Sequence, residues 1–201
     1  VLGYRLATNE ADCMRFAEEI GYPVALKIVS PDILHKVDVG GVRVNIRNRE
    51  ELEKACQEMR RCVNKMEPEA DVWGILVQQM AEKGKETIIG MNRDPDFGAM
   101  LVFGMGGVYV EALRDVTFRL APIRESNAQH MVRSIRGHRI LEGVRGEKPS
   151  DVGAIVECLQ RLSQLVNDFE EITELDINPF IVFDKGKGAK VIDARILIGE
   201  R

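Results

Sequence analysis

The stretch PVALKIVSPDILHKVDVGGVRVNI, residues 23–46, places a lysine inside an apolar strand and follows it with a histidine and two glycines. Residues 23–29 are rich in aliphatic side chains, which predicts a buried strand, and residues 42–46 predict a second one. Lys27 interrupts the first strand, and a buried ammonium group is costly unless an anion meets it. The diglycine allows close approach of the backbone to a ligand, with N–H groups that can face phosphate oxygens. This combination suggests phosphate chemistry.

His35 adds a titratable imidazole to this stretch. A single histidine is more often structural than catalytic, and we interpret His130 and His138, which lie in helical or basic surroundings, as structural. His35 differs because lysines and glycines surround it and because Ile33 and Leu34 anchor its loop. An imidazole presented in this way is suited to accept a phosphoryl group covalently.

The composition is that of an ordinary globular protein. Of 201 residues, 45% are hydrophobic, 30% are charged and 5% are aromatic, and the net charge is −4. A mildly acidic chain with few aromatic side chains gives no reason to expect nucleic acid as a partner. The longest uncharged stretch, 97–110, is too short and too rich in glycine to span a membrane. The four cysteines lack metal-binding spacing, which favours free thiols and a cytoplasmic location.

Periodicity and turn signals predict a mixed α/β (α+β) protein with two lobes. Helical spacing and capping residues predict helices over 9–20, 48–65, 125–136 and 150–168. Apolar runs between turn residues predict further strands over 72–80, 86–92, 99–103, 108–112, 116–121, 172–177, 180–183 and 189–194, the last two as a hairpin. A glycine-containing turn at 81–85 separates a smaller α/β lobe, 1–79, from a larger antiparallel α+β lobe, 80–201.

The segment ELDINPF, residues 174–180, holds a second concentration of polar groups. Alternation places its carboxylates and Asn178 on one face of a strand, which Pro179 is expected to end. If this strand pairs with the one over 189–194, Asn178 and Asp193 reach one hard cation, for which Mg²⁺ is the natural choice. A solvated acidic strand face explains the same pattern without a metal.

Three further features each have two explanations. The glycine loop GMGG, 104–107, either cradles phosphate or only permits a tight hairpin, since it lacks the lysine spacing of a P-loop. Glu86 is either placed for a ribose hydroxyl or is an exposed glutamate at the start of a strand. Arg119 either faces an anion or pairs with Asp115.

Four blocks in order, LKIVSPDILHKVDVGGV, ILVQQMAEKGKETIIG, RGEKPSD and ELDINPF, resemble the ATP-grasp subunit of nucleoside-diphosphate-forming acyl-CoA synthetases. The chain looks most like the β subunit of ADP-forming acetate–CoA ligases, and the resemblance covers essentially its whole length. It implies an ATP-grasp fold, with adenine nucleotide held between two lobes. The family's amino-terminal helix has no counterpart in residues 1–79, so we expect a trimmed form. The implied partner is the CoA-binding α subunit, in an α₂β₂ heterotetramer.

The resemblance also implies roles for individual residues. The expected nucleotide contacts are Lys27 to the phosphates, the Gly40–Gly41 loop beside it, Gln78, Gln79 and Met80 to adenine, and Glu86 to the ribose. Asn178 and Asp193 would hold Mg²⁺, with ATP or ADP as the substrate. His35 would carry the phosphoryl group between a histidine of the α subunit and ADP.

Two other functions fit the same sequence. An ATP-grasp carboxylate ligase that works through acyl phosphate would need no phosphohistidine, so His35 is the residue that distinguishes it. A regulatory ATP-grasp domain of an acetyltransferase would need no catalysis. The joint presence of Lys27, Asn178 and Asp193 argues against that second alternative.

Overall fold

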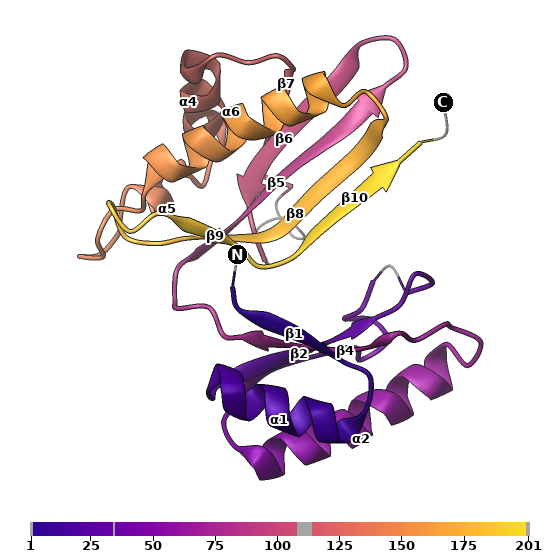
Figure 1. Ribbon diagram of the computed structural model, residues 1–201. Coiled ribbons are helices and arrows are strands. Elements are labelled where there is room, and N and C mark those ends of the chain that lie inside the picture. Colours follow the sequence, from indigo (N-terminus) through magenta and orange to yellow (C-terminus); the bar gives the residue numbers. More distant parts are fainter. Residues whose placement is uncertain (1, 34, 108–113, 200–201) are drawn as a thin grey trace. The chain divides into compact units, whose positions relative to one another are not determined.

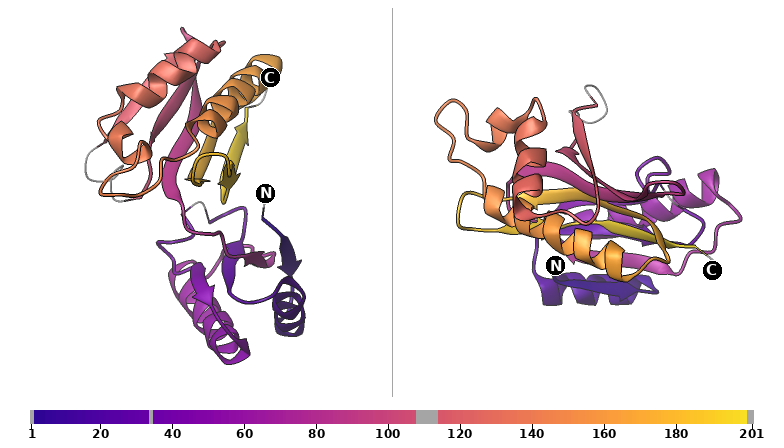
Figure 2. Two further views of the ribbon diagram at one scale, coloured as in Figure 1. Left: turned by 90° about the vertical axis from the view of Figure 1, so that its left-hand side faces the viewer. Right: turned by 90° about the horizontal axis from the view of Figure 1, so that it is seen from above.

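The computed structural model describes residues 2–33, 35–107 and 114–199. They form two compact units, Leu2–Ala81 and the chain from Glu82 onward, which we call the first lobe and the second lobe. In each lobe, taken by itself, helices cover one face of an antiparallel sheet (Figures 1 and 2). The break after Ala81 falls inside the turn at 81–85. No helix among the described residues has the length and apolar composition needed to cross a bilayer.

The first lobe has a four-stranded sheet and two helices. Its elements are β1 (Tyr4–Ala7), α1 (Glu10–Ile20), β2 (Val24–Val29), β3 (Val42–Ile46), α2 (Arg49–Met66) and β4 (Gly74–Gln79), and the strand order is β1-β4-β2-β3. Both helices begin at asparagine caps: Asn9 accepts the N–H of Asp12, and Asn48 accepts the N–H of Glu51. The helices and strands predicted for this lobe are confirmed to within about two residues.

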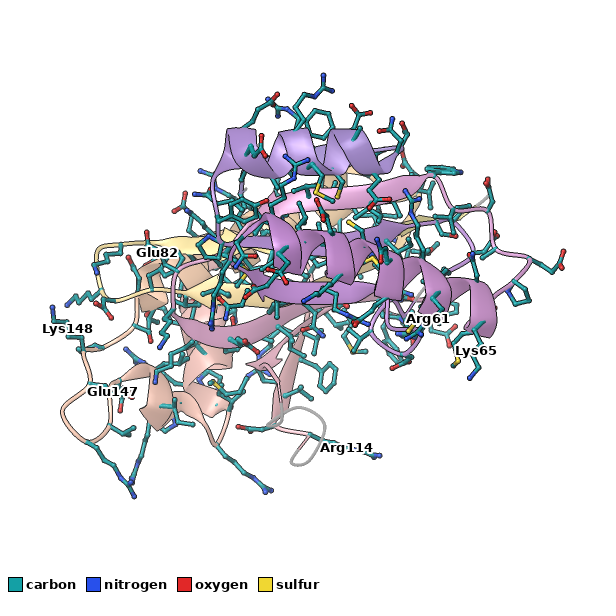
Figure 3. The ribbon with its side chains drawn as sticks, turned by 90° about the horizontal axis from the view of Figure 1, so that it is seen from below. Arg61, Lys65, Glu82, Arg114, Glu147 and Lys148 are labelled. Carbon is teal, nitrogen blue, oxygen red and sulfur yellow. The ribbon has the colours of Figure 1, made fainter. Side chains whose placement is uncertain are left out.

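One face of the first-lobe sheet is apolar and carries the helices. Val24, Leu26 and Ile28 of the central strand β2 are almost fully buried in a cluster that includes residues of α1 and α2. Because side chains alternate along a strand, Lys27 lies on the opposite face. The helices have an apolar side toward the sheet and a charged side outward, from which Arg61 of α2 projects (Figure 3).

The cysteines are free thiols, as predicted. Cys13 of α1 and Cys56 of α2 meet between the helices, with their sulfur atoms 3.4 Å apart. The hydrogen bond to Cys56 and burial raise the pKa of Cys13, and burial raises the pKa of Cys158 to about 11. Because the thiolate is the reactive form of cysteine, Cys13 and Cys158 are poor nucleophiles at neutral pH.

The second lobe has a larger sheet with the strand order β10-β8-β5-β6-β7, and β9 pairs with β8. Its elements are β5 (Lys85–Asp94), β6 (Gly98–Met105), β7 (Val116–Leu120), α4 (Glu125–Ser134), α5 (His138–Leu141), α6 (Val152–Asp168), β8 (Ile172–Val182), β9 (Ala189–Val191) and β10 (Ala194–Ile198). Helices α4 and α6 cover one face of this sheet (Figure 1), where the main apolar cluster lies. The predicted strand over 108–112 lies outside the described residues, and the short helix α5 was not predicted.

Strand β8 corrects the prediction that Pro179 ends a strand. Thr87 of β5 pairs with Phe180, and Ile89 pairs with Ile177, so Asn178 and Pro179 together oppose a single residue of β5. This is a β-bulge, in which one residue needs no ladder hydrogen bond, and the missing N–H of proline is tolerated there. The strands predicted over 172–177 and 180–183 are therefore one strand.

The RGEKPSD segment, 145–151, is fastened to the hairpin between β8 and β9. The Asp151 carboxylate accepts N–H groups of Ala154, at the start of α6, and of Gly186 and Gly188 in the hairpin. These bonds, with that from Gly188 the largest cause, hold the pKa of Asp151 below its usual range. Residues 145–149 of the segment remain exposed, and Glu147 and Lys148 project from it (Figure 3), whereas Ser150 is buried.

Replacing Asp151 with alanine is expected to lower the free energy of unfolding by about 1–2 kcal/mol, the cost of losing a helix cap and its further N–H bonds. Because the carboxylate pKa is lowered in the folded state, its contribution is complete above the ordinary aspartate pKa of about 4. The contribution is lost as the pH falls through the lowered folded-state pKa. Denaturant unfolding at several pH values measures this, with Asp184→Ala, which removes an exposed ion pair to Lys187, as the control. Equal effects of the two variants at neutral pH would contradict the assignment.

Candidate functional site

Two polar side chains of the first lobe are buried on the sheet face that carries no helix. Lys27 is 7% exposed and Gln78 is 4% exposed. Lys27 pairs in register with Leu76 and Ala25 pairs with Gln78, so Lys27 and Gln78 are diagonal neighbours on β2 and β4. Diagonal neighbours lie within reach of long side chains. The predicted phosphate-contacting lysine and one predicted hinge residue therefore share one small area of the first lobe.

The loop that follows β2 presents His35 to solvent. Ile33 on one side of the histidine and Val39 on the other are buried in the core of the first lobe. The Asp32 carboxylate accepts the N–H of Asp71, which ties the loop to the segment before β4. The sequence predicted the anchor at Ile33; Val39 was missed, and Leu34 lies outside the described residues.

The two glycines of this loop have a different role from the expected one. The N–H of Gly40 donates to the Val37 carbonyl, and the N–H of Gly41 donates to the Lys36 carbonyl, so both donors are used within the loop. A Cβ atom at Gly41 would lie 2.6 Å from Cγ2 of Ile28. The expectation that these N–H groups face phosphate oxygens is therefore wrong for this conformation: the glycines hold the His35 loop tightly against β2.

The predicted hinge continues directly from β4. The N–H of Gln79 donates to the Gly3 carbonyl, and the N–H of Met80 donates to the Pro23 carbonyl, so both donors are engaged within the first lobe. The sulfur of Met80 also accepts the N–H of Asn45. Gln79 is exposed, whereas Gln78 is buried. The backbone is thus tied to the first lobe as far as Met80, the next-to-last residue of that lobe.

Glu86 lies on the sheet face of the second lobe that carries no helix. Its neighbour Thr87 is fully buried on the helix-covered side and donates its hydroxyl to the Phe180 carbonyl. Alternation therefore directs Glu86 to the open face, where it is exposed. The N–H of Gly106 donates to the Glu86 carbonyl, which brings the glycine loop against this end of β5.

The backbones of Asn178 and Asp193 are hydrogen-bonded, which is the strand pairing on which the predicted cation site depends. The N–H of Asn178 donates to the carbonyl of Asp193, and the N–H of Ile192 donates to the carbonyl of Pro179. The strand predicted over 189–194 is interrupted here, because β9 ends at Val191 and β10 begins at Ala194. Asp193 thus lies in a break between two strands, opposite the bulge of β8.

The chemistry of this pair suits a hard cation with few protein ligands. Asn178 and Asp193 offer one amide and one carboxylate oxygen donor, and Mg²⁺ commonly takes one or two protein oxygens with water and phosphate completing its shell. Among the described residues, no three histidine, cysteine or acidic side chains form a closed metal cage. The charge of Asp193 also acts on Asp176. Burial raises the pKa of Asp176, the Arg195 guanidinium lowers it, and the carboxylates of Glu174 and Asp193 raise it further.

The sequence left two roles open for Arg119, and the structure does not support the ion pair with Asp115. The Asp115 carboxylate accepts the N–H groups of Arg136 and Gly137, whereas the Arg119 guanidinium donates to the Phe118 carbonyl. Asp115 therefore has a structural role at the base of the glycine loop, and Arg119 stays half-buried on β7.

Comparison with known proteins identifies the fold. The model of the ATP-grasp domain family matches residues 1–198. The chain belongs to the ATP-grasp family. Its fold is therefore the ATP-grasp fold, as the resemblance implied. This ATP-grasp chain is 47% identical to the β subunit of ADP-forming acetate–CoA ligase II from Pyrococcus furiosus, over 96% of this chain and 83% of that subunit, and belongs to the same group.

Longer relatives contain the same domain. The ADP-forming 4-hydroxybutyrate–CoA ligase of Nitrosopumilus maritimus is 50% identical over 95% of this ATP-grasp chain. The ADP-forming acetate–CoA ligase I of Archaeoglobus fulgidus is also 50% identical. This chain spans 27% and 29% of the lengths of these two relatives, respectively. A solved structure of the dinucleotide forming acetyl-coenzyme A synthetase 1 of Candidatus Korarchaeum cryptofilum matches with a TM-score of 0.82 and 44% identity, over 99% of this chain and 85% of that chain. That structure contains coenzyme A and Mg-AMPPCP, with its phosphohistidine segment pointing towards the nucleotide binding site.

Proposed function

We propose that this chain is the nucleotide-binding part of an ADP-forming acyl-CoA synthetase, with acetyl-CoA as the expected acyl substrate, and that it transfers a phosphoryl group between His35 and ADP. The observation that carries the proposal is the His35 loop. An exposed imidazole sits between two buried anchors, Ile33 and Val39, in a loop that leaves the strand containing the buried Lys27. Exposure lets a partner's phosphohistidine reach the ring, and the anchors limit the loop's freedom.

We assign each of the other residues to a part of the nucleotide or to Mg²⁺ according to the chemical group of its side chain. Lys27 contacts the nucleotide phosphates, the segment Gln78, Gln79 and Met80 meets adenine, and Glu86 accepts hydrogen bonds from the ribose. The hinge N–H groups of Gln79 and Met80 are already used, so adenine would be met by other atoms of these residues. Asn178 and Asp193 would hold Mg²⁺, which neutralises phosphate charge when bound.

The proposed reaction consists of two phosphoryl transfers. An unprotonated ring nitrogen of His35 attacks the phosphorus of a phosphohistidine on the partner, and a P–N bond forms as the partner's P–N bond breaks. A terminal oxygen of ADP then attacks that phosphorus: a P–O bond forms as the P–N bond to His35 breaks, and His35 leaves as neutral imidazole with its proton on the other ring nitrogen. Lys27 stabilises the charge on the phosphate oxygens during the second transfer.

The proposed partner is a CoA-binding α subunit, in an α₂β₂ heterotetramer located in the cytoplasm. The support for the partner is that a relative of nearly the same length is named a β subunit, whereas longer relatives contain this domain within one chain. A chain limited to this domain would depend on that partner for CoA binding and for choice of the acyl group.

ATP synthesis by the assembled synthetase tests the proposal. The chain together with its CoA-binding partner is expected to form ATP from acetyl-CoA, phosphate and ADP, and the chain without the partner is expected to bind Mg-ATP in calorimetry without turnover. Failure to bind Mg-ATP would favour the regulatory alternative. Turnover by an enzyme whose His35 never becomes phosphorylated would favour the ATP-grasp carboxylate ligase that works without a phosphohistidine.

A further inference from the structure

The glycine loop at 104–107 lies directly against Glu86, although almost twenty residues separate them in the chain. The N–H of Gly106 donates to the Glu86 carbonyl at 2.8 Å. A Cβ atom at Gly106 would lie 3.0 Å from the carbonyl carbon of Glu86 and 3.1 Å from its Cβ. The loop backbone therefore packs so closely on Glu86 that a side chain at position 106 would require a shift of a few tenths of an ångström.

Gly107 lies next to the carboxylate itself. Its φ of +60° is in the left-handed region, which glycine adopts without strain. A Cβ atom at this position would lie 3.2 Å from Oε2 of Glu86. Because position 107 has no side chain, the Glu86 carboxylate oxygen has room to lie beside it.

The base of the loop is fixed independently of Glu86. Met105 is buried in the core of the second lobe. A Cβ atom at Gly137 would lie 2.7 Å from Cγ of Met105, and the N–H groups of Gly137 and Arg136 both donate to the buried carboxylate of Asp115. A Cβ atom at Gly104 would lie 2.7 Å from the Asp115 carbonyl oxygen. The loop therefore has a rigid support from which it can fix its neighbour.

We propose that the glycine loop positions the Glu86 carboxylate for the ribose hydroxyls, with Gly107 as the positioning residue that sets selectivity for ribonucleotides. This inference rests on the proposed function, in which Glu86 contacts the ribose. A hydroxyl-to-carboxylate hydrogen bond needs a separation of about 2.5–3.0 Å. Displacing Oε2 by a few tenths of an ångström, as a Cβ at 107 requires, disturbs that bond without removing the carboxylate.

The test compares ADP with 2′-deoxy-ADP and 3′-deoxy-ADP as substrates of the assembled synthetase. The wild-type enzyme is expected to prefer ADP over at least one deoxynucleotide by about tenfold or more in kcat/KM, the usual effect of a hydrogen bond to a charged group. Glu86→Gln and Gly107→Ala are each expected to reduce this ratio several-fold, mainly by weakening the use of ADP. Because both act on one contact, the double variant is expected to lose no more selectivity than Glu86→Gln alone.

Gly98→Ala is the matched control. Gly98 lies at the start of β6 with a φ of +80°, and nothing lies within 4 Å of the position that a Cβ would occupy. Like Gly107→Ala, it places an alanine at a positive φ, and it is expected to keep the wild-type ratio. A merely structural effect of Gly107→Ala would lower activity with ADP and with the deoxynucleotides equally, and that result overturns the inference.

The experiment separates failure of the inference from failure of the proposed function. If Glu86→Gln loses the selectivity and Gly107→Ala keeps it, the inference alone is wrong. If the wild-type enzyme does not use ADP, or if Glu86→Gln leaves the ratio unchanged, the proposed contact to the ribose is wrong and the inference falls with it.

Discussion

Replacing His35 with asparagine is expected to lower ATP formation by the assembled synthetase by at least about 10⁴-fold, the scale of loss seen when a catalytic nucleophile is removed. Asparagine has a similar size and polarity, but it cannot carry the phosphoryl group. The buried anchors Ile33 and Val39 are untouched, so the loop is expected to keep its conformation. Affinity for Mg-ATP, measured by calorimetry, is expected to stay within about threefold of the wild-type value.

His130→Asn is the control for this prediction. His130 is exposed on α4 of the second lobe, and the sequence pattern assigns it no role in catalysis. The control variant is expected to turn over at the wild-type rate. A His35→Asn enzyme with full activity would remove the histidine relay and leave the carboxylate ligase alternative.

Replacing Lys27 with methionine is expected to lower kcat/KM for ADP by about 10²-fold or more, as losing one preorganised donor to a charged group does. Methionine fills a similar volume without a charge, so the variant is expected to fold, with an unfolding temperature lowered by the loss of the lysine's own polar interaction. Initial rates at varied ADP concentrations give the first quantity, and thermal unfolding of the same preparation gives the second.

Lys54→Met changes the charge in the same way at a different place. Lys54 is an exposed residue of α2 with an ion pair to Glu50, and α2 packs on the opposite face of the sheet from Lys27. It is expected to leave the kinetics unchanged. Similar losses in the two lysine variants would mean that Lys27 acts only through the general charge of the lobe.

Local signals predicted much of the first lobe. Asn9 and Asn48 mark the starts of α1 and α2 because their side chains cap the helices, and that interaction depends on residues only three positions away. The buried strand around Lys27 was predicted from its aliphatic run in the same way. Such features depend only on residues close together in the chain, so they can be predicted from a single sequence.

Features that depend on a distant partner were predicted less well. A proline such as Pro179 is expected to end a strand, but the register between β5 and β8 creates a bulge that accommodates it. The diglycine at 40–41 looked like a phosphate loop, yet its donors are used by the carbonyls of Val37 and Lys36. Proximity of Asn178 to Asp193 was predicted only by assuming that their strands pair. The contact of Gly107 with Glu86 had no local signal at all.

Phosphoryl labelling tests the central claim most directly. The assembled synthetase is incubated with Mg²⁺ and ATP labelled at the γ-phosphate, and the chain is then digested and its peptides are mapped. We predict an acid-labile, base-stable label on the peptide that contains His35, absent from the His35→Asn variant and retained in His130→Asn. A catalytically active enzyme that carries no label on this chain, or carries it at another residue, would contradict the proposed function.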